Sequence, residues 1–134
     1  MSEQYRVFLI GGDDDEEALF TLLDDGDDCR LRCEYRDKTI EGAATDFFQA
    51  LCDVRMRLAQ NSLIPFCYGA SLNVYPSGMA RDMGQGLKAY KLTMGNHARM
   101  ADLVGIFAEG PDIIPASVEI QEQFFRDWLA SPRP

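Results

Sequence analysis

Several features of an exported or membrane-bound protein are missing from this sequence. No apolar run approaches the roughly 20 residues that a transmembrane helix requires. The opening residues, MSEQYR, show no basic segment followed by an apolar stretch, so we expect no signal peptide. We therefore expect a cytoplasmic protein, and in that compartment its cysteines, Cys29, Cys33, Cys52 and Cys67, should be reduced thiols.

Histidine is also scarce, because His97 is the only one in 134 residues. Nucleophilic catalysis would require a serine or cysteine beside a base. His97 lies between Gly95-Asn96 and Ala98, where the sequence predicts a turn, and nothing in the pattern directs Cys67 or Ser71 toward it. We interpret His97 as a solvated loop residue and predict no catalytic residue and no enzymatic activity.

The sequence lacks complete metal-binding patterns. An EF-hand loop that began at Asp13 would need glycine at its sixth position and glutamate at its twelfth, but Ala18 and Asp24 stand there. Zinc sites use more closely paired cysteines and histidines than this chain offers. We predict no bound metal and buried, reduced cysteines.

Nucleotide-binding motifs are incomplete as well. Gly84-Gln85-Gly86 lacks the third glycine of a dinucleotide fingerprint and the Gly-Lys-Ser/Thr ending of a P-loop. We predict no cofactor, with these glycines serving backbone turns and tight packing. A glycine-rich loop over residues 78–88, in which Arg81 and Lys88 hold an anion, remains the alternative.

Acidic residues are abundant, and they are unevenly placed. The net charge is −9, and all of it lies in residues 1–28, since the acids and bases from Cys29 onward cancel. A segment with this much negative charge repels nucleic acid and anionic membranes and attracts basic surfaces. We therefore expect neither nucleic acid nor membrane as a partner. Most of these acids form two blocks, which consist of Asp13, Asp14, Asp15, Glu16 and Glu17, and of Asp24, Asp25, Asp27 and Asp28.

Alternating side chains predict strands in the first part of the chain. Residues 5–10 are largely β-branched or aromatic and stop at Gly11, which is typical of a strand. In residues 29–36, cysteine, leucine and tyrosine alternate with charged side chains, which predicts a half-buried strand with a basic outer face. A turn at Asp37 then leads into a hairpin partner over residues 39–43.

Two longer segments show helical spacing. Residues 46–60 predict a helix with Thr45 or Asp46 as its cap, and residues 116–130 predict another, capped by Ser117. We expect the stripe of the second helix to face the core; it comprises Val118, Gln121, Phe125, Trp128 and Leu129.

The remaining segments carry weaker signals. The carboxylates of residues 13–17 suit a helix start, so a short helix is expected up to residue 23, with a surface strand as the alternative. We predict a loop over 24–28, an extended stretch over 66–75, an irregular loop over 75–90, a strand over 87–94, and either helix or strand over 99–107. The class is α+β, with a mostly antiparallel sheet packed with two main helices in a single globular domain over residues 1–134.

One stretch carries a family resemblance. Residues 73–92, NVYPSGMARDMGQGLKAYKL, and the later DIIPASV of residues 112–118 resemble small bacterial immunity proteins of interbacterial toxin systems, including type VI secretion and Rhs toxins. The resemblance implies a role rather than a fold or mechanism, and it assigns no functional residue. It implies a cognate toxin domain as partner.

Charge and resemblance together predict a protein that binds and neutralises a toxin by occluding a basic cleft with an acidic surface. The contact residues that we expect are the two acidic blocks, with a second candidate group formed by Tyr75, Met79 and Arg81. Two other classes stay open: a small hydrolase or transferase that uses residues 78–88, and a self-associating adaptor.

Overall fold

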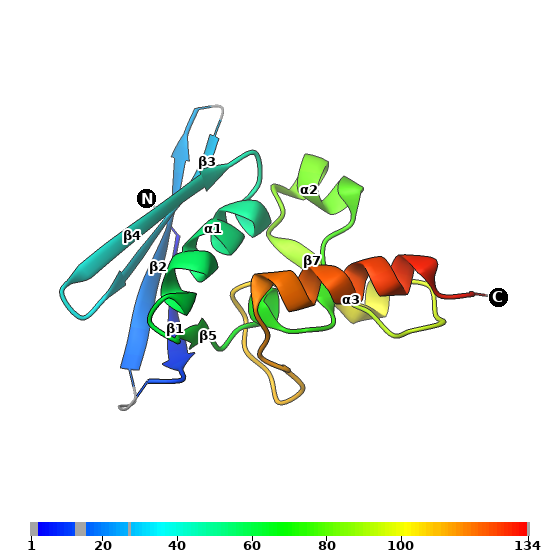
Figure 1. The fold of residues 1–134 in the computed structure, drawn as a ribbon. Helices are drawn as coiled ribbons and strands as arrows, with labels where there is room; N and C mark the ends of the chain where they lie inside the picture. Colours follow the sequence, from blue (N-terminus) through cyan, green and yellow to red (C-terminus); the bar gives the residue numbers. More distant parts are fainter. Residues whose placement is uncertain (1–2, 13–15, 27, 134) are drawn as a thin grey trace.

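The computed structural model describes residues 3–12, 16–26 and 28–133. These residues form an α+β fold with two antiparallel sheets, which confirms the predicted class (Figure 1). The strands are β1 (Gln4–Ile10), β2 (Glu16–Asp25), β3 (Asp28–Tyr35), β4 (Lys38–Ala44), β5 (Ile64–Pro65), β6 (Val74–Tyr75), β7 (Lys88–Lys91) and β8 (Leu103–Gly105). The α-helices are α1 (Phe47–Ala59), α2 (Gly78–Gly84) and α3 (Val118–Ala130), and 3₁₀ turns occur at Tyr68–Ala70 and Met100–Asp102.

The first sheet has five strands in the order β4-β3-β2-β1-β5, and all neighbouring strands are antiparallel. The alternation predicted for β3 is confirmed, because Cys29, Leu31, Cys33 and Tyr35 are buried while Arg30 and Arg32 are only partly covered. The predicted hairpin from β3 into β4 is also present.

Helix α1 covers the inner face of this sheet (Figure 1). The prediction for its start is confirmed with Asp46 as the cap, since a carboxylate oxygen of Asp46 accepts a hydrogen bond from the backbone N–H of Gln49 at 2.8 Å. Phe48 and Leu51, on its apolar face, are fully buried.

The short helix expected up to residue 23 is wrong, because β2 occupies Glu16–Asp25. The carboxylates of Glu16 and Glu17 suit a helix start, but the alternating Ala18, Phe20 and Leu22 are buried inward, and β1 and β3 pair with β2 on both sides. Tertiary pairing therefore decides the structure of this segment. The predicted loop over 24–28 is shorter than expected, because β2 continues to Asp25 and β3 begins at Asp28.

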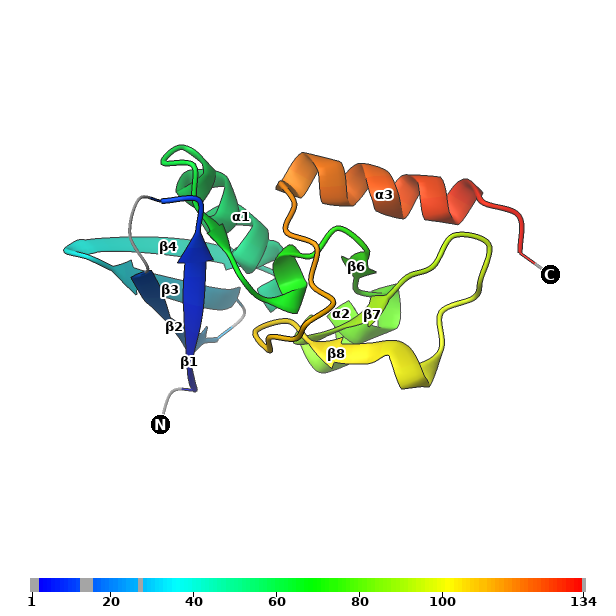
Figure 2. The same cartoon turned by 90° about the horizontal axis from the view of Figure 1, so that it is seen from below.

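The second sheet has the order β6-β7-β8, and α3 lies alongside it, whereas α1 lies on the first sheet (Figure 2). Ser117 caps α3 as predicted, since its hydroxyl accepts a hydrogen bond from the Ile120 N–H at 3.2 Å. Of the predicted stripe, Gln121 and Trp128 are buried, but Leu129 is 50% exposed, so its assignment to the core is wrong.

The irregular loop predicted over 75–90 is wrong, because it contains α2. The hydroxyl of Ser77 caps this helix by accepting a hydrogen bond from the Ala80 N–H at 3.0 Å. The helix ends at Gly84, and the residue that follows it, Gln85, has a left-handed φ of 57°. The glycines that suggested a loop thus stand at the ends of a helix, where glycine is common.

Three other segments are more broken than the sequence predicts. The stretch over 66–75 is interrupted by the turn at Tyr68–Ala70, and the strand expected over 87–94 is limited to β7. The ambiguous segment 99–107 contains both a 3₁₀ turn and a strand, β8. Among the described residues, we find no helix with the length and apolar character needed to cross a membrane.

Trp128 provides a test of the contact between α3 and the second sheet. Its side chain is 9% exposed, and its indole N–H lies 3.1 Å from the carbonyl oxygen of Thr93 and 2.9 Å from that of Asn96. We expect Trp128→Ala to lower the free energy of unfolding by about 3–5 kcal/mol, measured by urea denaturation. The adjacent, exposed Leu129→Ala is the control and should change it by no more than about 0.5 kcal/mol. Equal effects of the two substitutions would contradict a structural role for the indole.

Candidate functional site

The described parts of the two acidic blocks lie at opposite ends of the first sheet. Glu16 begins β2 and Asp25 ends it, and a strand of that length spans about 30 Å at roughly 3.3 Å per residue (Figure 1). Asp13, Asp14, Asp15 and Asp27 lie outside the described residues. The sequence-predicted surface is therefore divided into two separate acidic ends.

At the first of these ends, Glu16 already has an internal partner. Its carboxylate accepts two hydrogen bonds from the Arg36 guanidinium, at 2.6 and 2.8 Å. Glu17 is exposed and lies opposite Phe8, whose side chain is partly exposed on the same strand pair. This end thus combines an ion pair with a small apolar area.

The other acidic end lies beside α2. The α2 segment is attached to the start of α1 through an ion pair between Arg81 Nη1 and Asp46 Oδ2 at 2.9 Å. A hydrogen bond from the Phe47 N–H to the Gln85 carbonyl at 2.7 Å adds a second link. The start of α1 directly follows β4, whose last residue, Ala44, pairs with Cys29 next to the β2–β3 turn. The end of β2, the start of β3 and α2 therefore share one end of the molecule (Figure 1). We call the junction of these two strands the acidic turn, after the sequence DDGDD of residues 24–28.

Within the second candidate group, the structure separates internal residues from exposed ones. The Arg81 guanidinium lies over the rings of Phe48 and Tyr75, at 5.2 and 5.5 Å, and Tyr75 stacks on Phe125 with ring centroids 4.1 Å apart. Tyr75 and Arg81 thus hold α2 in place. Met79, in contrast, is 71% exposed.

Met83, which the sequence analysis did not select as a contact residue, is 82% exposed on the same helix. Residues four positions apart lie on one face of a helix, so Met79 and Met83 form a continuous apolar edge. We use the name α2 end for this end of the molecule, which carries the acidic turn together with Met79 and Met83. The helical spacing of these two methionines is the sequence signal that could have identified this surface.

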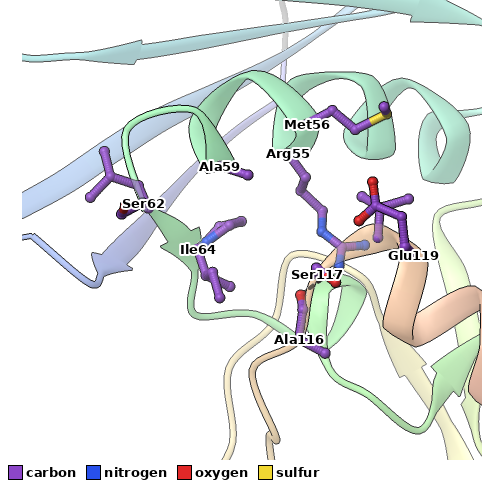
Figure 3. A pocket seen from close by; sticks show the side chains of 11 residues that line it. Arg55, Met56, Ala59, Ser62, Ile64, Ala116, Ser117 and Glu119 are labelled. Carbon is purple, nitrogen blue, oxygen red and sulfur yellow. Dashed lines mark hydrogen bonds between the residues drawn. The ribbon is translucent and has the colours of Figure 1, made fainter.

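A pocket lies elsewhere, where α1, β5 and the first turn of α3 meet (Figure 3). Its volume is about 260 Å³. Much of its wall is apolar, and this part consists of Met56, Ala59, Leu63, Ile64, Pro65 and Val118. Figure 3 shows the Arg55 side chain extending from α1 toward the start of α3, where Ser117 and Glu119 line the same pocket. Within the described part of the chain, the linings of this pocket and of a second one beside Phe8 include neither Lys88 nor His97.

Arg55 is a buried cation that is solvated by protein carbonyls. Its side chain is only 3% exposed, and it donates hydrogen bonds to the Gly69 carbonyl at 3.0 Å, to the Ala116 carbonyl at 2.9 Å and to Gln121 Oε1 at 2.6 Å. Burial lowers the pKa of Arg55 from its ordinary value. An arginine nevertheless stays protonated in proteins, so this site carries a positive charge.

Gln121 completes this network. Its amide nitrogen lies 2.9 Å from each of the carbonyl oxygens of Gly69, Ser71 and Val74. Sequence reasoning recognised neither residue as part of a polar site. The signal for Arg55 was its position on the buried face of α1, three residues after Cys52 and three before Leu58.

The four cysteines are buried, and no two of them form a disulfide. Burial raises the pKa of Cys33 to about 12 and that of Cys67 to about 11. Among the described side chains, no group of three or more histidines, cysteines and carboxylates is arranged to hold a metal ion.

Comparison with models of known protein families gives no match to this sequence, and comparison with curated proteins gives none either. Function is therefore inferred from the charge, exposure and geometry of the residues themselves.

The Arg55 network predicts a large cost for losing Gln121. We expect Gln121→Leu to lower the free energy of unfolding by about 3 kcal/mol or more, because Arg55 loses an acceptor, the carbonyls of Ser71 and Val74 lose the amide donor, and that of Gly69 keeps only Arg55. Gln123→Leu, at an exposed position on the same helix, should have little effect. Urea denaturation of both variants makes the comparison, and equal stabilities would contradict the importance of the network.

The cysteines give a second prediction. The thiolate is the reactive form, so buried thiols with raised pKa values should react with Ellman's reagent at pH 8 only as fast as the protein opens. In denaturant without reductant, we expect four thiols per chain. Fewer than four, or stoichiometric zinc by elemental analysis, would contradict the prediction of four free thiols.

Proposed function

We propose that this protein binds a basic toxin domain through the α2 end and neutralises it, as a cognate immunity protein. The observation that carries the proposal is that the junction of β2 and β3, which is acidic in sequence, lies at the same end of the molecule as two exposed methionines. Carboxylates attract a basic partner, and apolar side chains stabilise the complex that forms.

The acidic turn supplies the long-range part of recognition. Charges of one sign steer an oppositely charged partner and raise the association rate, but charges at an interface rim add little to affinity. The other acidic block, at the start of β2, adds to the same negative field without belonging to the contact surface. Its Glu16 is engaged by Arg36.

The methionines supply the short-range part. Met79 and Met83 are largely exposed, and burying a methionine side chain stabilises a complex by about 1.5–3 kcal/mol. Methionine is enriched at interfaces because its flexible side chain adapts to the opposing surface.

The attachment of α2 favours this role. The Asp46–Arg81 ion pair and the Phe47–Gln85 hydrogen bond fix the helix before any partner arrives. A fixed helix loses little conformational entropy on binding, so more of the contact energy is retained in the complex.

The test uses the polypeptide encoded by the gene adjacent to that of this chain, with binding followed by stopped flow at two salt concentrations. Replacing Asp24, Asp25, Asp27 and Asp28 by asparagine should slow association by about one to two decades at low salt, with a smaller effect at high salt. Met79→Ala and Met83→Ala should instead accelerate dissociation, by about tenfold or more each.

Two control variants distinguish the α2 end from the rest of the surface. Met100→Ala removes an exposed methionine from another element and should leave dissociation unchanged. Neutralising Asp13, Asp14, Asp15, Glu16 and Glu17 should slow association without changing dissociation. Equal effects of Met79→Ala and Met100→Ala would move the interface away from α2. No binding by the neighbouring product, or a stable dimer of this chain that buries α2, would overturn the proposal.

A further inference from the structure

The pocket at the start of α3 contains a positive charge without a close carboxylate partner. Within residues 3–12, 16–26 and 28–133, no carboxylate oxygen lies within 4.0 Å of the Arg55 guanidinium nitrogens. Three protein oxygens accept hydrogen bonds from Nη1 and Nη2. Nε–H has no hydrogen-bond acceptor among those residues, and no fully buried side-chain nitrogen lacks a partner there, so Nε is not fully buried, and Arg55 lines the pocket.

The first turn of α3 adds donors to the same pocket. The Ser117 hydroxyl accepts a hydrogen bond from the Ile120 N–H, and the Ser117 carbonyl accepts one from the Gln121 N–H. The N–H groups of Val118 and Glu119, which line the pocket, have no acceptor within the described chain. Together with the dipole of this 13-residue helix, they favour a negative group at this position.

The rest of the wall selects against a fully polar ligand. Met56, Ala59, Ile64 and Pro65 make that part of the lining apolar. A ligand that fits both the positive end at Arg55 and the apolar wall carries one carboxylate on a short apolar group. The pocket volume of about 260 Å³ limits the size of this ligand. Such a ligand pairs with Arg55 and buries its hydrocarbon part away from water.

We propose that this pocket binds a small apolar monocarboxylate, whose carboxylate pairs with the Arg55 guanidinium and whose hydrocarbon group lies against Ala59 and Ile64. Glu119 lines the same pocket and opposes the bound anion, so it sets an upper limit on affinity. The site is separate from the α2 end, and its occupancy does not depend on the proposed toxin.

Hexanoate is the probe, and hexan-1-ol and hexylamine are its matched neutral and cationic analogues. Titration of the full chain by calorimetry should show hexanoate binding at least tenfold more tightly than hexan-1-ol, with no binding of hexylamine. In parallel NMR spectra, hexanoate should shift the Arg55 Nε–H resonance and the amide resonances of Val118 and Glu119.

Variants at the edge of the network test the location without removing Arg55. Ala59→Phe fills the apolar part of the pocket at an exposed position and should weaken hexanoate binding at least tenfold. Gln49→Phe, exposed on the same helix but outside the pocket, is the matched control and should leave binding unchanged. Glu119→Gln should strengthen binding several-fold because it removes the opposing charge.

Equal binding of hexanoate and hexan-1-ol, or hexanoate binding that survives Ala59→Phe, would overturn the proposal. Binding of peptides through their C-terminal carboxylate with no binding of the free acid would also overturn it. Met79→Ala should not change hexanoate affinity, so this experiment and that on toxin binding can fail independently.

Discussion

The buried guanidinium of Arg55 is the constraint on which the arrangement of the two sheets depends. A charge that leaves water is tolerated only when protein groups replace its solvation, and here the segment after β5, the residue before Ser117 and Gln121 of α3 supply the oxygens. The backbone must approach closely for this to happen. At Gly69, a Cβ would lie 2.6 Å from Leu51 Cδ2, so the absence of a side chain there allows the carbonyl to reach Arg55.

Helix α1 therefore organises the molecule beyond the sheet that it covers. Its cap, Asp46, holds α2 through Arg81, while Arg55, two and a half turns later, holds α3. Gly86 contributes to the first attachment, since its φ of +69° and the nearby Asp46 leave no room for a side chain. The α2 end and the Arg55 pocket are thus positioned by the same helix but use different faces and different chemistry.

The sequence predicts best the elements that are specified locally. The alternation of β3 and the caps Asp46 and Ser117 depend on neighbouring residues alone, and all are present in the structure. The strand β2 was interpreted as a helix because its pairing partners, not its own composition, decide its conformation. The separation of the two acidic blocks follows from that strand, so it could not be predicted. Arg55 was missed for a similar reason, since the partners of its hydrogen bonds lie 14, 61 and 66 residues away.

Asp46 serves two elements with one carboxylate. One oxygen accepts from the backbone of α1 and the other pairs with Arg81. When α2 detaches, the first turn of α1 loses the hydrogen bond from the Phe47 N–H to Gln85 as well as the neighbour that neutralises its cap. Detachment of α2 and fraying of α1 are therefore one cooperative event. The surface helix and the helix that covers the first sheet form a single unit of local unfolding, which spans the boundary between the two sheets.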